Sequence, residues 1–396
     1  MQVCTEYDSN HKDRASRPVV TAVTRQPDAL EAARELTSQL QGQVLALVLF
    51  FCSAEYDLEA LSAGLQQGFG ATRVVGCTTA GEISAAGYER SSITALGFSS
   101  SHFTVASVLV DRMERFGLHD AQEVVDGLVR CCRSQALAPI KGHSFALTLL
   151  DGLSNREEVV LAALNAAMGG IPHFGGSAAD DNHLSLTSVY YGGHFYSNAA
   201  VVVLFNTPLE FEVFTTHHLQ PTVEKLVVTR VDSDTRRVLE LNAEPAAEAY
   251  ARTIGCQPEE LDLYSFASNP LAVRMGRHYY PRAIQQVNSD LSLTFYCAVE
   301  NGIVLTAMQP GSLQDNLHQL FRGLHSRLGT ILLTIGCDCF LRRLEAEGRE
   351  EHEAVASILR RYGVIGFNTY GEQFNGMHIN QTFTGVAIGQ RNISTA

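Results

Sequence analysis

Apolar runs and amphipathic segments alternate along the chain in one order that occurs three times. In the first unit, the apolar run 45–50 predicts a buried strand. Three leucines at helical spacing, between Leu58 and Leu65, then predict an amphipathic helix. The apolar pair 74–75 predicts a second strand, which leads into a glycine-rich loop at 76–82. The unit is therefore strand, helix, strand and glycine-rich loop.

The second unit follows the same order. Residues 145–150 form an apolar run and predict a strand. Ser154 with Glu157 matches a capping box and predicts the start of a helix. Residues 175–181 then form the glycine-rich loop.

The third unit begins at 330–335, which also predicts a strand. A helical stretch broken near Gly348 follows, and then an apolar pair at 364–365 and a loop at 366–372. The first and third loops share the pattern Gly-x-x-Thr-x-Gly-Glu, which favours an ancient duplication over a chance match to a common α/β pattern. Glycine permits the positive φ that such a turn would use.

Each loop is followed by a β-like segment, at 92–98, 189–205 and 383–388. Strands that alternate with helices predict an α/β (mixed α+β) fold, in which repeated strand–helix–strand units form mixed sheets flanked by helices.

The stretch 211–304 departs from this order, because most of it predicts strands and only 246–254 predicts a helix. Asn242-Ala243-Glu244-Pro245 interrupts the pattern. We therefore expect two domains, 17–242 and 243–396, after a disordered polar segment at 1–16.

Composition narrows the class of protein. Hydrophobic residues make up 45% of the chain and charged residues 18%, which excludes a disordered chain. The net charge of −13 argues against nucleic acid as a partner. The longest apolar run, 44–52, is about half the ~20 residues of a membrane helix, so no membrane insertion is expected. The nine scattered cysteines and the lack of a signal peptide predict a reducing cytoplasm.

Common catalytic signatures are missing from the sequence. It contains no dinucleotide fingerprint, no Walker A motif, no nucleophile elbow and no zinc-protease motif. We therefore expect that the protein is not an enzyme. It also has no kinase or receiver signature, so any signal must pass to another chain.

Each of three polar features in the sequence has two possible interpretations. Cys337-x-Cys339 is either a metal or redox site or buried packing at a strand end. His217-His218 offers an imidazole for a metal, or is an ordinary core or exposed pair. Residues 376–382 are either a polar pocket or a hydrogen-bonded turn. A solvated acidic helix face, or a partner-facing surface, is predicted from Glu345, Glu347, Glu350, Glu351 and Glu353.

At these residues the chain resembles proteins with an N-terminal and a C-terminal FIST domain, over about residues 20–390. The resemblance is carried by Gly76 to Ile83, Gly175 to Asp180, Cys339 with Arg342, Gly366 to Glu372, and Asn380 to Thr382. It implies a bacterial sensory input module for a small ligand. Ala179 departs from the wider family, which often has glycine there.

Residues 216–222, 339–345 and 370–376 resemble one branch, the nitric-oxide-sensing haem proteins called NosP. That branch implies a b-type haem (haem b) held by a histidine, with nitric oxide bound to the ferrous iron. It also implies regulation of a separate histidine kinase, and through it two-component or cyclic-di-GMP signalling and biofilm dispersal. The oligomeric state stays open, and a homo-oligomer is one option.

The haem hypothesis needs a neutral imidazole as axial ligand and cations for the propionates. We rank His218 first as the iron ligand, ahead of His217 and His378. The candidates for the haem propionates are Arg274, Arg277, Arg282, Arg342 and Arg343.

Other functions remain open. A small organic ligand such as an amino acid would use a pocket made of Thr369, Gly371, Glu372, Asn380 and Thr382. An enzyme would use Cys77 or Cys339 as nucleophile, with a lowered thiol pKa. A structural adaptor is a third option.

Overall fold

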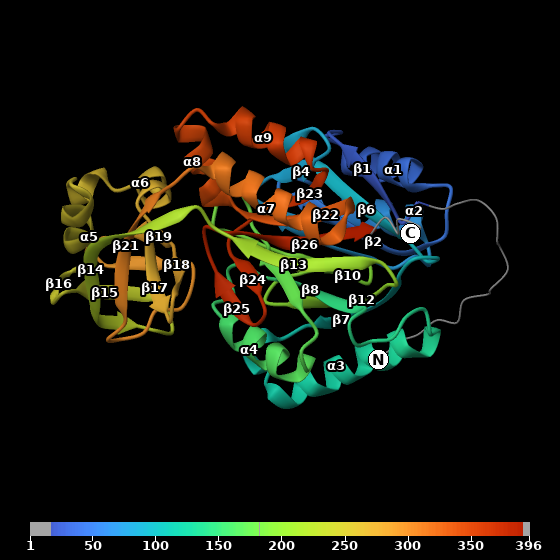
Figure 1. The fold of residues 1–396 in the computed structure, drawn as a ribbon, viewed down its shortest axis with the longest axis horizontal. Coiled ribbons are helices and arrows are strands. Elements are labelled where there is room, and N and C mark those ends of the chain that lie inside the picture. The colour runs from blue at the N-terminus through green and yellow to red at the C-terminus, as the bar shows by residue number, and fades with distance from the viewer. Residues whose placement is uncertain (1–16, 182, 391–396) are drawn as a thin grey trace.

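Three copies of one chain topology make up the body of the protein (Figure 1). The computed structural model describes residues 17–181 and 183–390, so the predicted disorder of 1–16 lies outside it. Each copy runs through an edge strand, a helix, a central strand, a second helical segment, a parallel strand, a β-hairpin and a return strand. The first copy comprises β1 (Val19–Thr24), α1 (Ala29–Leu40), β2 (Leu45–Ser53), α2 (Leu58–Phe69), β3 (Val74–Thr79), β4 (Glu82–Ser84), β5 (Gly87–Glu89) and β6 (Ile93–Ser99).

The other two copies repeat this order. The second comprises β7 (Thr104–Val110), α3 (Leu118–Gln135), β8 (Ser144–Leu150), α4 (Glu157–Met168), β9 (His173–Ser177), β10 (Val189–Tyr191), β11 (His194–Tyr196) and β12 (Ala200–Asn206). The third comprises β13 (Glu210–Thr216), α7 (Leu313–Leu328), β22 (Thr330–Cys339), α8 (Phe340–Gly348), α9 (His352–Arg361), β23 (Val364–Thr369), β24 (Glu372–Phe374), β25 (Met377–Ile379) and β26 (Phe383–Gln390). The predicted α/β class and its three units are confirmed.

The copies exchange their hairpins in a cycle. The three sheets have the orders β1-β6-β2-β3, β7-β12-β8-β9 and β13-β26-β22-β23, and each accepts one further hairpin. Hairpin β4–β5 pairs with β23, hairpin β24–β25 pairs with β9, and hairpin β10–β11 pairs with β3. No copy therefore completes its sheet from its own strands.

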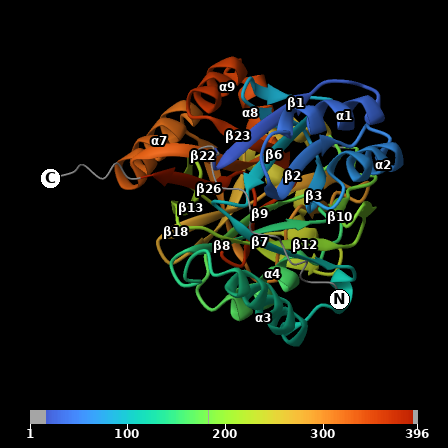
Figure 2. The same ribbon diagram turned by 90° about the vertical axis from the view of Figure 1, so that its right-hand side faces the viewer.

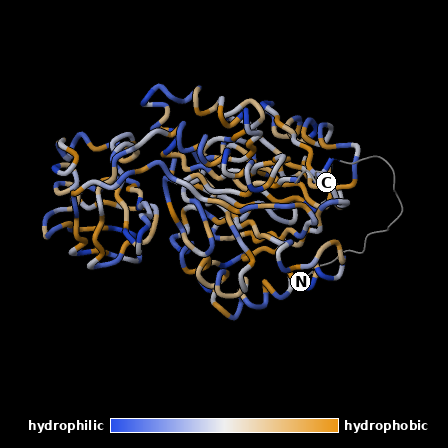
Figure 3. The backbone as a smooth tube through the Cα atoms, in the orientation of Figure 1, coloured by the Kyte–Doolittle hydropathy of each residue, from blue (hydrophilic) through white to orange (hydrophobic). Residues whose placement is uncertain are grey.

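The three sheets share one core. Apolar side chains from the central strands of all three copies, including Phe51, Leu147 and Ile335, belong to a single buried cluster. The outer face of each sheet packs on its own helices, which lie on three sides of the body in Figure 2. Figure 3 shows the hydrophobic residues concentrated along the inner strands. No helix in the part of the chain that the structure describes is long and apolar enough to cross a membrane.

A separate sheet is inserted into the third copy, between β13 and α7, and projects from the body on the left of Figure 1. We call residues 219–310 the inserted unit. It comprises β14 (Leu219–Asp232), β15 (Arg237–Leu241), β16 (Glu244–Pro245), α5 (Ala246–Ile254), α6 (Leu263–Ser268), β17 (Leu271–Met275), β18 (His278–Arg282), β19 (Ile284–Val287), β20 (Leu293–Phe295) and β21 (Val304–Pro310). The expected domain limit at 242 falls inside this unit, and the third copy has strands on both sides of it.

The first glycine of each glycine-rich segment lies in a strand rather than in a turn, whereas Gly81 of the first segment has the expected positive φ, +130°. Gly76, Gly175 and Gly366 lie within β3, β9 and β23, and none of them has a positive φ. Their role is close approach, because a Cβ on Gly366 would lie 1.8 Å from the backbone oxygen of Gly336. Glycine is present here because the neighbouring strand leaves no room for a side chain.

The predicted capping box is also wrong. Helix α4 begins at Glu157 with Arg156 as its N-cap, so Ser154 lies two residues too early to cap it. The hydroxyl of Ser154 instead donates to Oε2 of Glu157 over 3.4 Å.

Candidate functional site

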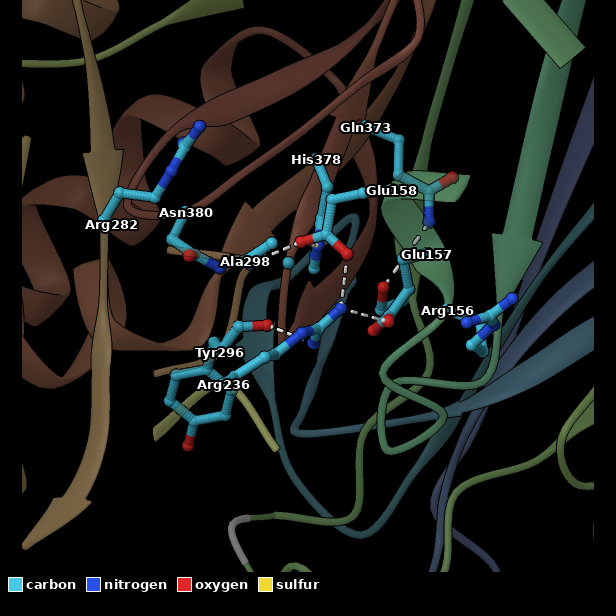
Figure 4. Close-up of polar contacts among 12 residues, drawn as sticks. Arg156, Glu157, Glu158, Arg236, Arg282, Tyr296, Ala298, Gln373, His378 and Asn380 are labelled. Atoms are coloured by element: carbon cyan, nitrogen blue, oxygen red, sulfur yellow. Dashed lines mark hydrogen bonds and ion pairs between the residues drawn. The ribbon is translucent and has the colours of Figure 1, made fainter. Parts of the chain in front are cut away.

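Four charged or polar side chains meet where the inserted unit contacts the body (Figure 4). Glu157 and Glu158 lie in the first turn of α4, and His378 lies in β25. Arg236 comes from the turn between β14 and β15, where its φ is +54°. We call these four residues the junction cluster.

One guanidinium joins the two carboxylates. Nη2 of Arg236 donates to Oε2 of Glu157 over 2.7 Å and to Oε2 of Glu158 over 2.5 Å. Its Nη1 donates to the backbone oxygen of Tyr296 over 2.6 Å. Oε1 of Glu158 accepts from the backbone N–H of Ala298 over 2.7 Å and lies 3.1 Å from Nδ1 of His378. The side chains of Arg236 and Glu157 are 3% and 1% exposed, so the bond between them forms in a water-poor interior, whereas Glu158 is 30% exposed.

The electrostatics of the cluster favour ionised groups. Burial by itself would raise the pKa of Glu158, but His378 and Arg236 outweigh it and lower that pKa. Burial would likewise lower the pKa of Arg236, but Glu157 and Glu158 outweigh it and raise that pKa. The ion pair between Arg236 and Glu158 therefore persists at neutral pH.

Several buried polar atoms of this region have no hydrogen-bond partner among the described residues. They are Oε1 of Glu157, Nε of Arg236, Nε of Arg282 and Nε2 of His378. Buried polar groups in folded proteins are nearly always paired, because an unpaired group costs about 1–3 kcal/mol. Donors and acceptors left open together at one interface can bind the polar groups of a small molecule.

The same cluster can also hold a metal ion. One ligand atom from each of Glu157, Glu158 and His378 lies within 4.8 Å of the others, and no second such group occurs among residues 17–181 and 183–390. Imidazole and carboxylate are ordinary metal ligands. Arg236 already supplies one cation to these carboxylates.

His218, the first-ranked iron ligand, lies between β13 and β14 in a second buried network. Its Nε2 lies 2.8 and 2.9 Å from the carboxylate oxygens of Glu345, and its Nδ1 accepts from Nη1 of Arg342 over 3.0 Å. Nε of Arg342 donates to Asp338 over 2.7 Å, and the hydroxyl of Tyr88 donates to the other oxygen of Asp338. Burial lowers the pKa of His218, and Arg342 lowers it further. Both ring nitrogens of a neutral imidazole are thus occupied.

The other proposed haem ligands lie in different surroundings. Nδ1 of His217 accepts from the N–H of Leu219 over 3.3 Å. Arg343 is buried and donates to Glu347 over 3.0 Å, whereas Arg274 is exposed in β17 and stacks on Tyr279. The structure brings Arg342 to His218 but does not bring Arg274 or His378 into contact with it.

Most polar groups of the predicted ligand pocket bond to one another, but Oε1 of Glu372 has no partner among the described residues. Oε2 of Glu372 accepts from the N–H and hydroxyl of Thr382 over 2.9 and 2.8 Å. Thr369 donates to the backbone oxygen of Gly371 over 2.9 Å, and Nδ2 of Asn380 donates to Tyr370 over 3.1 Å. Ligand binding by these residues stays a prediction.

The repeat explains this arrangement. Glu82 occupies the position of Glu372 in the first copy, and Ser92 occupies that of Thr382. The hydroxyl of Ser92 donates to Oε2 of Glu82 over 2.6 Å. In each of the two loops, a buried glutamate thus accepts a hydrogen bond from the hydroxyl ten residues later in the chain. This bond stabilises the start of the return strand.

The cysteine candidates are deeply buried. Burial raises the pKa of Cys77, Cys337 and Cys339 well above the ordinary value of a thiol. A protonated thiol is a poor nucleophile and a poor metal ligand. This argues against the cysteine-enzyme hypothesis and favours buried packing for Cys337-x-Cys339.

Most of the junction cluster is not predictable from the sequence. The sequence pattern assigns Glu157 only to a helix start, and it gives Glu158 and Arg236 no role. Arg236 follows Glu158 by 78 residues, and His378 follows it by 220. His378 was predicted as a ligand, but only as the third choice for iron. No local signal connects these residues.

Comparison with known proteins gives matches along most of the chain. A family model described as the FIST N domain matches residues 46–244, and one described as the FIST C domain matches 246–375. The chain is also similar to an uncharacterized protein of Methanocaldococcus jannaschii, with 22% identity over 226 residues. That match covers 56% of this chain and 43% of the archaeal protein, so it spans less than half of that relative.

Proposed function

Because the chain belongs to the FIST family, we propose that it is a sensory signalling protein and that its input is a small ligand bound at the junction cluster. The observation that carries this proposal is the set of buried polar atoms without partners, including Oε1 of Glu157 and Nε of Arg282. They lie where two parts of the chain meet, so a ligand there would contact both.

The junction suits a sensor for a thermodynamic reason. A ligand shifts a conformational equilibrium only by its differential affinity for the two states. Glu157, Glu158 and His378 belong to the body, whereas Arg236 and Arg282 belong to the inserted unit. Any change in the relative position of these two parts changes the contacts of the ligand. Ligand binding is therefore coupled to the conformation of the chain.

Thermal stabilisation of the purified chain by polar metabolites, with amino acids first, tests the proposal. A ligand at 100 times its Kd stabilises the folded state by about 2.7 kcal/mol. We expect the stabilisation to be lost in Glu158→Gln and kept in Arg274→Ala, since Arg274 is an exposed arginine outside the junction. Equal stabilisation of both variants would place the ligand elsewhere.

Haem and nitric oxide form a second, finer hypothesis that rests on the resemblance to the NosP branch. The side chains as placed do not fit a haem. Both nitrogens of His218 are hydrogen-bonded, and Nε2 of His378 lies over Gly371, where a single added carbon would come within 1.9 Å. Haem bound through His218 would first require the imidazole to leave Glu345.

Spectroscopy tests this second hypothesis directly. The purified protein is mixed with haem, and its Soret band is compared with that of His218→Ala. Loss of the band in the variant would support His218 as the ligand, and an unchanged band would remove it from consideration. Titration with nitric oxide would follow only after haem binding is established.

We also propose that the protein acts in the cytoplasm, without catalytic activity of its own, on a separate signalling protein. A histidine kinase is the partner that the resemblance implies, with cyclic-di-GMP output and biofilm dispersal downstream. An autophosphorylation assay of a candidate kinase, with and without this protein, tests the link. An unchanged rate at saturating protein would count against that kinase.

A further inference from the structure

The junction cluster leaves one buried carboxylate oxygen without a partner among the described residues. Two carboxylates, Glu157 and Glu158, share one guanidinium, that of Arg236. The side chain of Glu157 is 1% exposed, and its Oε1 has no partner among the described residues. A buried carboxylate oxygen without a partner is costly unless a cation or a proton joins it.

We propose that Glu157, Glu158 and His378 bind one divalent transition-metal cation, and that this cation competes with Arg236. The inference deepens the proposed function by naming the input at the same junction. Mixed imidazole and carboxylate ligands suit Mn²⁺ and Zn²⁺.

The geometry of the cluster is close to what an ion needs. One ligand atom of each residue lies within 4.8 Å of the other two. Ligand atoms about 2.0–2.2 Å from a shared ion lie closer together than that, so the side chains close by small rotations when the ion binds. Nδ1 of His378 is the ring nitrogen that faces Glu158. The two carboxylates start a helix, and Arg236 holds them together without the ion.

The metal ion and Arg236 compete because their partners belong to different parts of the chain. The three metal ligands belong to the body, whereas Arg236 belongs to the inserted unit. A divalent cation between the carboxylates repels the guanidinium and takes its oxygen partners. Metal binding therefore weakens a contact that holds the inserted unit to the body, and the coupling is reciprocal. Removal of the guanidinium must strengthen metal binding.

The test uses the full chain, stripped with a chelator and desalted, and Mn²⁺ as the probe. Mn²⁺ prefers oxygen ligands such as carboxylates to thiolates, which limits binding to the nine cysteines. The electron paramagnetic resonance signal of free Mn²⁺ reports binding. We expect Glu158→Gln and His378→Gln to weaken binding about tenfold or more, and Arg236→Gln to tighten it about tenfold.

A matched control separates this site from surface binding. His352 lies 3.9 Å from Glu347 on the surface of the body, so His352→Gln should leave the affinity unchanged. Circular dichroism and urea titration verify that each variant is folded. If Arg236→Gln does not fold, Arg236→Lys replaces it, and we expect a smaller gain in affinity because one ammonium bridges two carboxylates less well.

Two results would overturn the proposal. One is Mn²⁺ affinity that Glu158→Gln leaves unchanged, which would mean an adventitious ion only. The other is folded Arg236→Gln or Arg236→Lys protein that binds Mn²⁺ no more tightly than the wild type. A third result would separate the two proposals. If Mn²⁺ does not bind at Glu158 but a metabolite stabilises the wild type and not Glu158→Gln, the metal inference fails and the proposed function stands.

Discussion

Removal of Arg236 by Arg236→Ala should destabilise the protein more than removal of any exposed arginine. The side chain is 3% exposed and is the cation in direct contact with both Glu157 and Glu158. Loss of one partner of a buried ion pair leaves an uncompensated charge and costs about 3–5 kcal/mol. The unfolding entropy is about 2.1 cal/mol/K per residue, or about 0.8 kcal/mol/K for 396 residues. The melting temperature should therefore fall by about 4–6 °C.

The pH dependence gives an independent check. The pKa of Glu158 is lowered in the folded state, so between its folded and unfolded values the unfolded chain binds more protons. This contribution to stability is present above the unfolded pKa of about 4.3 and is lost as the pH falls through the folded value. Because Arg236 is one cause of the shift, Arg236→Ala should show a shallower loss of stability in acid.

Urea titration at pH 7 and pH 3, with Arg230→Ala as control, measures both effects. Arg230 also pairs with a glutamate, Glu240, but its side chain is 66% exposed, and the control should lose less than about 1 kcal/mol. A cost of Arg236→Ala equal to that of the control would refute the argument that burial makes this pair important.

Four further predictions concern the repeats and the His218 network. Burial raises the pKa of Glu82 to about 7, so the folded state binds the extra proton and loses stability as the pH rises from about 4.5 to 7; Glu82→Gln should abolish this slope in urea titrations at pH 5 and pH 8. Gly366→Ala forces a Cβ to within 1.8 Å of a backbone oxygen and should cost about 3 kcal/mol or more by thermal unfolding. Gly127→Ala meets no atom within 4 Å in α3 and should instead stabilise by about 0.5–1 kcal/mol. Tyr88→Phe strips a hydrogen bond from buried Asp338 and should cost about 1–3 kcal/mol, whereas an unchanged urea midpoint would exclude that bond as a stabilising contact.

Much of the fold could be predicted from the sequence, because local patterns encode it. Runs such as 45–50 are apolar because each strand is buried between its helices and the shared core. The break near Gly348 does separate α8 from α9, and helix 246–254 is α5. Gly81 has the positive φ expected of a turn, whereas Gly76, Gly175 and Gly366 are required because a neighbouring strand leaves no room for a side chain.

The candidate site could not be predicted in the same way. Glu345 looks like part of a solvated acidic helix face, yet it is buried on His218, which lies 127 residues earlier. The pattern of polar residues in the sequence does not indicate whether water or another side chain will form their hydrogen bonds.

The sequence by itself determined the three repeated units, their α/β class and the buried strands, because helix and strand periodicity are properties of neighbouring residues. Only the tertiary structure decided which copy receives each hairpin and that Arg236 meets Glu157, Glu158 and His378 at the junction. These contacts join residues far apart in the chain. Their stability comes from burial, which exists only once the three copies and the inserted unit have packed together.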